Sequence, residues 1–306
     1  MCYGPCEPDL VSTSVGKRVT VLQASRKDST QAATPLLAGV AVFCMHARNG
    51  VDALKLSVQG VTKTYRDGRK LVEALAPIDL TVADGEFVTL IGPSGCGKST
   101  LFNIVAGVDE PTSGIVAIDG NANSKRAGLS GYMPQQPLLL PWRTVEENVM
   151  LGLDVRRVPR KQAQHDALDL LKRFGLSDFA QNYPATLSGG MRQRVALLRT
   201  VLFNPSFLLL DEPFGALDAL TRLSLQMWLL DLWQALHASV LFITHDVREA
   251  LLLSDRIYVL SARPARVLRV VEVDLPRPRR QEHLALAPAV RLEQELLSLL
   301  LKEQQL

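Results

Sequence analysis

The sequence contains no hydrophobic run long enough to cross a lipid bilayer. Its longest apolar stretch extends from Leu36 to Met45, well short of the ~20 residues that a membrane-spanning helix needs. We therefore expect that the chain does not itself span a membrane, although it can lie against a protein that does. An excess of charge of one sign is also absent. The formal net charge is +3, so nothing in the composition indicates nucleic acid or another polyanion as a partner.

Cysteine is scarce as well. The four cysteines are Cys2, Cys6, Cys44 and Cys96, and their spacing matches neither a disulfide framework nor a metal-binding set. Cys2 and Cys6 alone could bind a metal, but no second pair of ligands follows them. The cysteine usage therefore favours a reducing compartment such as the cytoplasm.

The first 52 residues lack the periodicity of helices and strands. They mix Ser, Thr, Gly and Pro, so residues 1–52 are predicted to form a poorly ordered extension. Basic residues precede the apolar run, but they lie too far into the chain for a signal peptide, and no clean cleavage site follows. One hypothesis is that the working polypeptide starts at Met45, which the intact mass of protein from its native host would test.

Residues 92–99 read Gly-Pro-Ser-Gly-Cys-Gly-Lys-Ser and match the phosphate-binding pattern G-x-x-x-x-G-K-[ST] without a mismatch. Residues 86–91 are predicted to form a buried strand before this loop, and residues 98–105 a helix after it. Backbone N–H groups can therefore surround a phosphate at a helix N-terminus, with Lys98 near the β- and γ-phosphates and Ser99 on Mg²⁺. The residues predicted to hold the nucleotide here are Gly92, Pro93, Ser94, Gly95, Cys96, Gly97, Lys98, Ser99 and Thr100.

Two further apolar strands end in residues that suit phosphate chemistry. The strand predicted at 207–210 is followed by Asp211 and Glu212, and the strand at 240–243 leads to His245. Asp211 can hold Mg²⁺, Glu212 can deprotonate an attacking water, and His245 can hydrogen-bond the γ-phosphate. Taken singly, an acidic turn or a lone histidine is often structural. Together they are expected at one edge of a sheet, beside the phosphate loop.

A second small, polar helix start occurs at Ser188-Gly189-Gly190. Such a start can bind phosphate, although Ser188 as an ordinary helix cap is an equally good interpretation. One chain cannot easily use both phosphate sites on one nucleotide. A head-to-tail dimer can do so, with each nucleotide between the loop of one copy and Ser188 of the other.

Strands and helices alternate along most of the remaining chain, which predicts an α/β fold with a parallel sheet covered on both faces. Residues 54–58 alternate like an edge strand, and a helix is predicted at 219–236. Between about 140 and 204 the pattern is mainly helical, and it includes a capping box at Thr144 and Glu147.

These motifs resemble those of the nucleotide-binding subunits of ATP-binding-cassette (ABC) transporters, over about residues 54–275. The resemblance rests on Tyr65, the loop 92–99, Gln135, Leu187–Gly190, Asp211-Glu212, Gly215–Asp218 and His245. It implies a P-loop NTPase core with a mainly parallel sheet, an antiparallel β edge and an inserted α-helical subdomain. The implied domains are an ATPase domain at 53–280, with the helical subdomain at about 140–204, and a helical tail at 281–306.

The resemblance also implies a role for each site residue. Tyr65 would stack on the adenine base, although it could simply cover a loop. Asp218 would couple two sites, while Ser188, Gly189 and Gly190 would touch the γ-phosphate across a homodimer. The expected cofactors are ATP and Mg²⁺, and the expected catalytic residues are Glu212, His245 and Gln135. The expected metal ligands are Ser99, Gln135 and Asp211. Because Cys96 lies in the phosphate loop, its modification is expected to inhibit the ATPase, and ATP is expected to protect it.

Several features resemble bacterial importers rather than other cassette proteins. A single phosphate loop is present, and residues 138–143 and 261–278 are similar to subunits that import nitrate, alkanesulfonates, taurine or thiamine-type pyrimidines. A permease is expected to dock near Gln135–Asn148, with Trp142 as an anchor or, equally, as a core residue. The predicted protein is therefore an ATPase at the cytoplasmic face of the membrane that powers import and depends indirectly on a solute-binding protein. The alternative is a cassette ATPase that regulates or assembles a soluble partner.

Overall fold

The computed structural model describes residues 54–304 except residues 69, 123–124, 205 and 216. The predicted extension at 1–52, the hypothetical start at Met45 and the three N-terminal cysteines lie outside the described residues. Among the described helices, none combines the length and the hydrophobicity needed to cross a bilayer.

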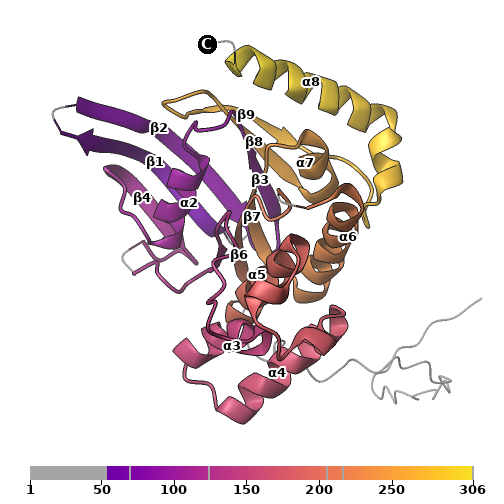
Figure 1. The fold of residues 1–306 in the computed structure, drawn as a ribbon. Helices are drawn as coiled ribbons and strands as arrows, with labels where there is room; N and C mark the ends of the chain where they lie inside the picture. Colours follow the sequence, from indigo (N-terminus) through magenta and orange to yellow (C-terminus); the bar gives the residue numbers. More distant parts are fainter. Residues whose placement is uncertain (1–53, 69, 123–124, 205, 216, 305–306) are drawn as a thin grey trace, which may run out of the picture. The chain divides into compact units, whose positions relative to one another are not determined.

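The described strands form two sheets (Figure 1). The larger has the order β5-β6-β7-β3-β8-β9, in which the strands from β5 to β8 run parallel and β9 pairs antiparallel with β8. The smaller is antiparallel, with the order β2-β1-β4. The strands are β1 (Leu54–Asp67), β2 (Lys70–Ala83), β3 (Phe87–Ile91), β4 (Ser113–Ile118), β5 (Gly131–Met133), β6 (Phe207–Asp211), β7 (Ser239–Ile243), β8 (Arg256–Leu260) and β9 (Val267–Glu272).

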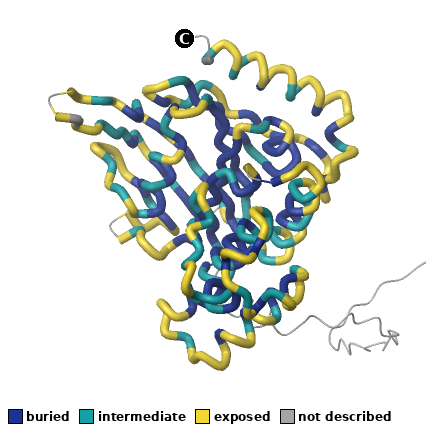
Figure 2. Tube along the Cα trace, viewed as in Figure 1, coloured by how far each residue is buried: buried dark blue, intermediate teal, exposed yellow. Residues whose placement is uncertain are grey.

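The central strands are buried throughout and mostly apolar because both faces of the larger sheet are covered. In β6, Leu208 and Leu210 face one core, whereas Phe207 and Leu209 face another. The same alternation occurs in β3 and β7, since successive side chains of a strand point to opposite faces. All three strands are therefore dark blue along their length in Figure 2.

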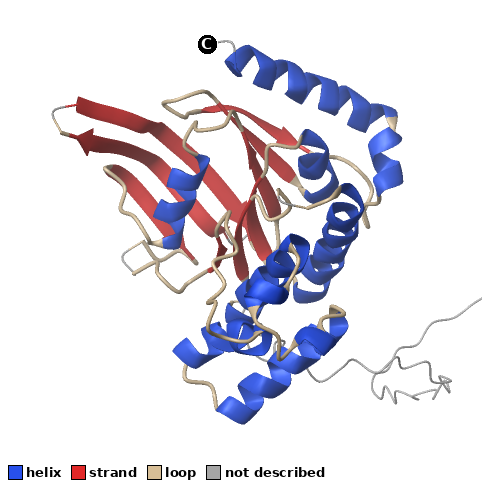
Figure 3. Cartoon of the chain, viewed as in Figure 1, coloured by secondary structure: helices blue, strands red, loops and turns tan. Residues whose placement is uncertain are grey.

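Each face of the larger sheet has its own helices (Figure 3). Helix α2 (Lys98–Ala106) lies between the two sheets, and its buried residues share a core with both. Helices α6 (Ala219–Leu236), α7 (Val247–Leu253) and α8 (Ala287–Gln304) contribute to the core on the opposite face. Short 3-10 helices occur at Ser177–Phe179, Pro184–Thr186 and Gln281–Ala285.

Three helices between β5 and β6 build a core of their own. They are α3 (Val145–Val155), α4 (Arg160–Arg173) and α5 (Gly189–Phe203). The predicted capping box opens α3: Thr144 Oγ1 accepts from the Glu147 N–H at 3.2 Å, and Glu147 Oε2 accepts from the Thr144 N–H at 3.0 Å. Helix α4 ends before Gly175, whose φ of 63° suits glycine.

The small sheet differs from the prediction of an edge strand at 54–58. Strand β1 continues to Asp67 and lies in the middle of its sheet, between β2 and β4. Its register shifts repeatedly against β2, so the alternation of apolar residues breaks after Val58 although the strand continues. The antiparallel part of the fold thus consists of this sheet and of β9.

Candidate functional site

The phosphate loop joins the carboxyl end of β3 to the first turn of α2. Gly97 is the last residue before the helix and has a φ of 127°, where other residues are strained. A Cβ at this position would lie 2.8 Å from Leu75 Cδ2 and 2.9 Å from the Ala74 carbonyl oxygen. Only glycine fits there, which explains why the motif requires it.

Lys98 folds back over its own loop. Its side chain is buried, and its Nζ donates to the carbonyl oxygens of Gly92 at 2.8 Å and Pro93 at 2.9 Å. The ammonium group is therefore held at the opening of the loop. There a bound phosphate can replace the two carbonyls as the acceptor of its hydrogen bonds.

Asp211 ends β6 behind the loop and is 3% exposed. Burial raises the pKa of its carboxyl, a hydrogen bond from Ser99 opposes this shift, the charge of Glu212 adds to it and the charge of Lys98 opposes it. Asp211 and Ser99 are therefore neighbours, as expected for two ligands of one cation.

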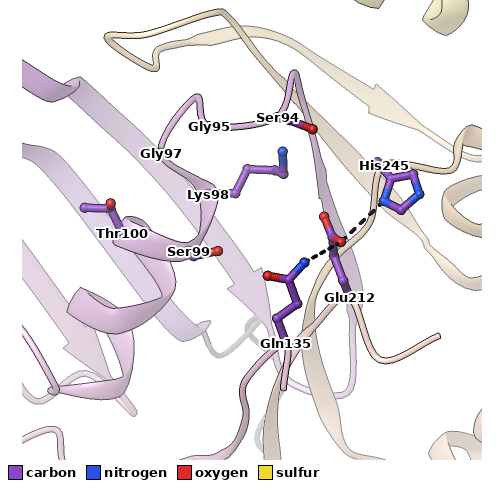
Figure 4. A pocket seen from close by; sticks show the side chains of 9 residues that line it. All are labelled: Ser94, Gly95, Gly97, Lys98, Ser99, Thr100, Gln135, Glu212 and His245. Carbon is purple, nitrogen blue, oxygen red and sulfur yellow. Dashed lines mark hydrogen bonds and ion pairs between the residues drawn. The ribbon is translucent and has the colours of Figure 1, made fainter. Parts of the chain in front are cut away.

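Glu212 adopts a φ of 45° immediately after β6, and its N–H donates to the Ile243 carbonyl at 3.0 Å. This turn directs its carboxylate to the open side of the sheet. Glu212 Oε2 accepts from Gln135 Nε2 at 3.1 Å and lies 3.4 Å from His245 Nδ1 (Figure 4). Glu212 thus contacts both Gln135 and His245, the other two residues that the sequence predicts as catalytic.

A pocket of about 510 Å³ opens between these groups (Figure 4). Its walls come from the phosphate loop, the segment after β5 and the ends of β6 and β7, which meet at one edge of the larger sheet. The lining residues are Ser94, Gly95, Gly97, Lys98, Ser99, Thr100, Gln135, Glu212 and His245.

The family described as ABC transporter matches residues 75–215. An uncharacterized ABC transporter ATP-binding protein of Methanocaldococcus jannaschii is 47% identical over 226 residues, which cover 74% of this chain and 85% of that protein. The chain belongs to the ABC transporter ATP-binding protein family. An aliphatic sulfonates import ATP-binding protein, SsuB of Bacillus cereus, is 42% identical over 74% of the chain and 89% of its own length.

Solved structures of cassettes have the same fold. A cassette dimer in a post-hydrolysis state, bound to ADP and Pi, superposes with a TM-score of 0.65 at 34% identity, covering 71% of this chain and 98% of that one. A subunit of a Clostridium perfringens ABC transporter complex gives a TM-score of 0.63 at 25% identity, covering 72% and 89%. The chain is therefore an ABC ATPase with the mixed α/β cassette fold, and the pocket is its candidate nucleotide site.

Tyr65 of this ABC ATPase lies on β1 and is not among the pocket-lining residues. Its hydroxyl donates to Asp109 Oδ2 at 2.9 Å and contacts Thr100, and the Lys63 ammonium lies 4.9 Å from its ring centroid. Asp109 also accepts from Lys63 at 2.6 Å. The sequence does not single out Asp109 because it lies 44 residues from Tyr65 and belongs to no motif.

The predicted residues at the starts of α5 and α6 also lie outside the pocket. Ser188 caps α5 by accepting from the Met191 N–H at 3.2 Å, and Gly189 and Gly190 begin that helix. Asp218 caps α6 in the same way, accepting from the Thr221 N–H at 3.0 Å. Within one chain, these residues do not complete the nucleotide site.

Cys96 lies in the phosphate loop, but its thiol is buried in the core. Its side chain is 2% exposed and belongs to the core between the two sheets. Burial raises the pKa of the thiol, although the charge of Lys98 and hydrogen bonds of the Lys98 and Cys96 backbone oppose the shift. Gly92, Pro93 and Cys96 do not line the pocket, and their part in nucleotide binding stays a prediction.

Proposed function

We propose that this chain is the ATP-hydrolysing subunit of an importer for a small solute, such as a sulfonate, nitrate or taurine, and acts at the cytoplasmic face of the membrane. The observation that supports hydrolysis is the convergence of Lys98, Gln135, Glu212 and His245 on one pocket. The name of the Bacillus cereus relative, which refers to sulfonate import, supports the solute class.

The donor atoms beside the loop fit Mg²⁺. Ser99 offers a hydroxyl, Asp211 a buried carboxylate and Gln135 an amide oxygen, and Mg²⁺ prefers such oxygen ligands. The pKa of Asp211 is raised by burial, and a cation would relieve that cost. Bound there, Mg²⁺ would neutralise charge on the β- and γ-phosphates.

Residues of the chain itself bind the phosphates and accept the proton. The loop N–H groups and Lys98 bind the phosphates, and Glu212 receives the proton of the water that attacks the γ-phosphorus. Gln135, which donates to Glu212 at 3.1 Å, orients that carboxylate. His245, at 3.4 Å from Glu212, hydrogen-bonds the γ-phosphate beside that carboxylate.

We infer that two copies close head to tail around two nucleotides. The pocket is open, and the exposed helix start at Ser188–Gly190 lies outside it, so a second copy is needed to bring both phosphate-binding elements to one ATP. The higher affinity of ATP for the closed dimer then drives the permease, and hydrolysis reopens the dimer.

The segment Gln135–Asn148 is the proposed contact with the permease, which itself receives solute from a binding protein. Trp142 in this segment is 71% exposed, so it does not belong to the core and is free to act as an anchor.

Replacement of Glu212 by Gln tests the reaction. Glu212→Gln keeps the shape of the side chain but cannot take a proton, so turnover should fall by about 100-fold or more. ATP affinity should stay unchanged, and light scattering should show an ATP-dependent dimer that persists. Glu272→Gln, an exposed site on β9, is the control. Normal ATP turnover by Glu212→Gln would refute the assignment.

A further inference from the structure

A buried carboxylate lies beside the segment that carries His245. Glu249 is in the first turn of α7, and its side chain is 8% exposed. Burial raises the pKa of this carboxyl, which hydrogen bonds from Thr244 and Gln226 partly offset. Because a carboxylate is costly to bury, the groups that bind it indicate its role.

The first of these groups is Thr244, which directly precedes His245. Thr244 Oγ1 donates to Glu249 Oε2 at 2.6 Å and accepts from the Asp246 N–H at 3.0 Å. The Thr244 N–H donates to the Leu90 carbonyl at 3.3 Å. Residues on both sides of His245 are therefore fixed. The His245 side chain is 60% exposed, so its position depends on this backbone.

The other groups come from α6. Gln226 Nε2 donates to Glu249 Oε1 at 3.0 Å, and Arg222 Nε lies 3.9 Å from the same oxygen. Arg222 also donates through Nη2 to the Leu217 carbonyl at 3.2 Å. Leu217 precedes Asp218, so Arg222 lies between the carboxylate and the loop that begins α6. Arg222 Nε is buried and has no hydrogen-bond acceptor among the described residues.

We propose that Glu249 is a positioning residue for ATP hydrolysis. It holds Thr244 so that His245 stays beside Glu212 in the pocket, and through its ion pair with Arg222 it connects this segment to the Leu217–Asp218 loop. The proposal rests on the role proposed above for His245. Loss of the carboxylate leaves the Thr244 hydroxyl without its buried acceptor, and the His245 segment then moves away from its catalytic position.

A split between kcat and KM should follow. Lys98 and the loop N–H groups bind ATP without help from Glu249, so KM and nucleotide affinity should stay within about threefold of the original values. Glu249→Ala and Thr244→Val should each lower kcat by about tenfold or more. Thr244→Ser keeps the hydroxyl and should retain kcat within about threefold, which a general loss of packing at this site would not explain.

The double variant Thr244→Val/Glu249→Ala tests whether the two residues act through one contact. Its kcat should be no lower than that of the more impaired single variant, because both substitutions remove the same hydrogen bond. Ser239→Ala is the matched control. It removes another buried hydroxyl, at the other end of β7, where Ser239 Oγ accepts from the Gly85 N–H at 2.9 Å. It should lower the melting temperature as Thr244→Val does, but leave kcat unchanged.

His245→Ala, measured in parallel, separates the two proposals. A normal kcat for His245→Ala would overturn both the role of His245 and the positioning role of Glu249. An impaired His245→Ala beside a Thr244→Val variant as active as Ser239→Ala would overturn only the role of Glu249. Additive losses in the double variant would also overturn it. If Glu249→Ala does not fold, the comparison of Thr244→Val with Thr244→Ser still decides the question.

Discussion

Cys96 lies in the phosphate loop, yet its thiol belongs to the core. The side chain is 2% exposed, and burial raises its pKa. The thiolate is the nucleophile that attacks alkylating reagents, so a thiol that is both buried and protonated should react slowly. If ATP slows this alkylation, it would do so because bound ATP makes local unfolding around Cys96 rarer. It would not do so by contacting the sulfur atom itself.

We expect N-ethylmaleimide to modify Cys96 in the native protein at least ~100-fold more slowly than in the unfolded chain at neutral pH. The rate should increase as the pH rises toward the raised pKa, because the thiolate fraction increases. Mass spectrometry of the peptide that contains Cys96 would follow the reaction. Equal rates in native and unfolded protein would show that the thiol is accessible.

The segment between β5 and α3 shows how an element can present apolar side chains on a fixed backbone. Arg199 Nη1 and Nη2 donate to the carbonyls of Leu138 and Pro137 at 2.8 and 2.7 Å. The Asn148 side chain bonds both the N–H and the carbonyl of Leu140, at 2.8 and 3.1 Å. Leu138 and Trp142 remain 60% and 71% exposed on this fixed segment. Such a segment suits a docking surface, because its backbone would lose little conformational entropy when a partner binds.

We expect Trp142→Ala to lower by tenfold or more the amount of permease that copurifies with this chain from detergent-solubilised membranes of its native host. The reason is that a Trp anchor buried at an interface contributes about 2 kcal/mol or more to binding. Leu71→Ala, which removes a side chain that is 65% exposed on β2, is the control. Melting temperatures would confirm that both variants fold. If only a soluble partner is recovered with the unmodified chain, the alternative function as a regulatory or assembly module holds.

Elements with strong local signals are predictable from the sequence. The helix expected at 219–236 is found at Ala219–Leu236, because Asp218 caps its start and His237, at a φ of 51°, ends it. Strand β1 is only partly predictable. Its continuation beyond Val58 depends on pairing with β2 and β4 rather than on its own alternation.

The candidate nucleotide site likewise has residues that the sequence predicts and residues that it does not. Lys98, Glu212 and His245 follow strand ends, so their meeting at one sheet edge can be expected from the order of the motifs. Asp109 and Glu249 act through side-chain contacts with Tyr65 and Thr244. The sequence motifs indicate neither contact: Tyr65 and Asp109 lie 44 residues apart, and Thr244 and Glu249 lie five apart but belong to no pattern that singles out Glu249.

At the scale of the whole molecule, only one of the two predicted phosphate-binding elements lines the candidate nucleotide pocket. The phosphate loop lines that pocket, and Ser188 does not. In a head-to-tail dimer, each site takes Lys98 and Glu212 from one copy and Ser188 from the other. A single chain that used its own Ser188 would need a rearrangement of the helices between β5 and β6.

Mixing of variants distinguishes these arrangements. Lys98→Ala should inactivate the half of a site that contains the phosphate loop, and Ser188→Arg the half that contains the helix start at Ser188. Each variant alone should therefore hydrolyse little ATP. In a mixed dimer, the Ser188→Arg copy supplies an intact loop and the Lys98→Ala copy an intact Ser188, which together make one complete site. ATP hydrolysis by the mixture, measured as phosphate release, should therefore exceed the sum of the separate variants.

A mixture of Lys98→Ala with Glu212→Gln is the matched control. Both substitutions lie on the loop side, so each site of the mixed dimer carries one of them and no activity should return. Recovery in the first mixture alone requires that one nucleotide be held by two chains, because no pairing within a chain restores a site. The same low activity in both mixtures would mean that each chain completes its own site, and the head-to-tail arrangement would be refuted.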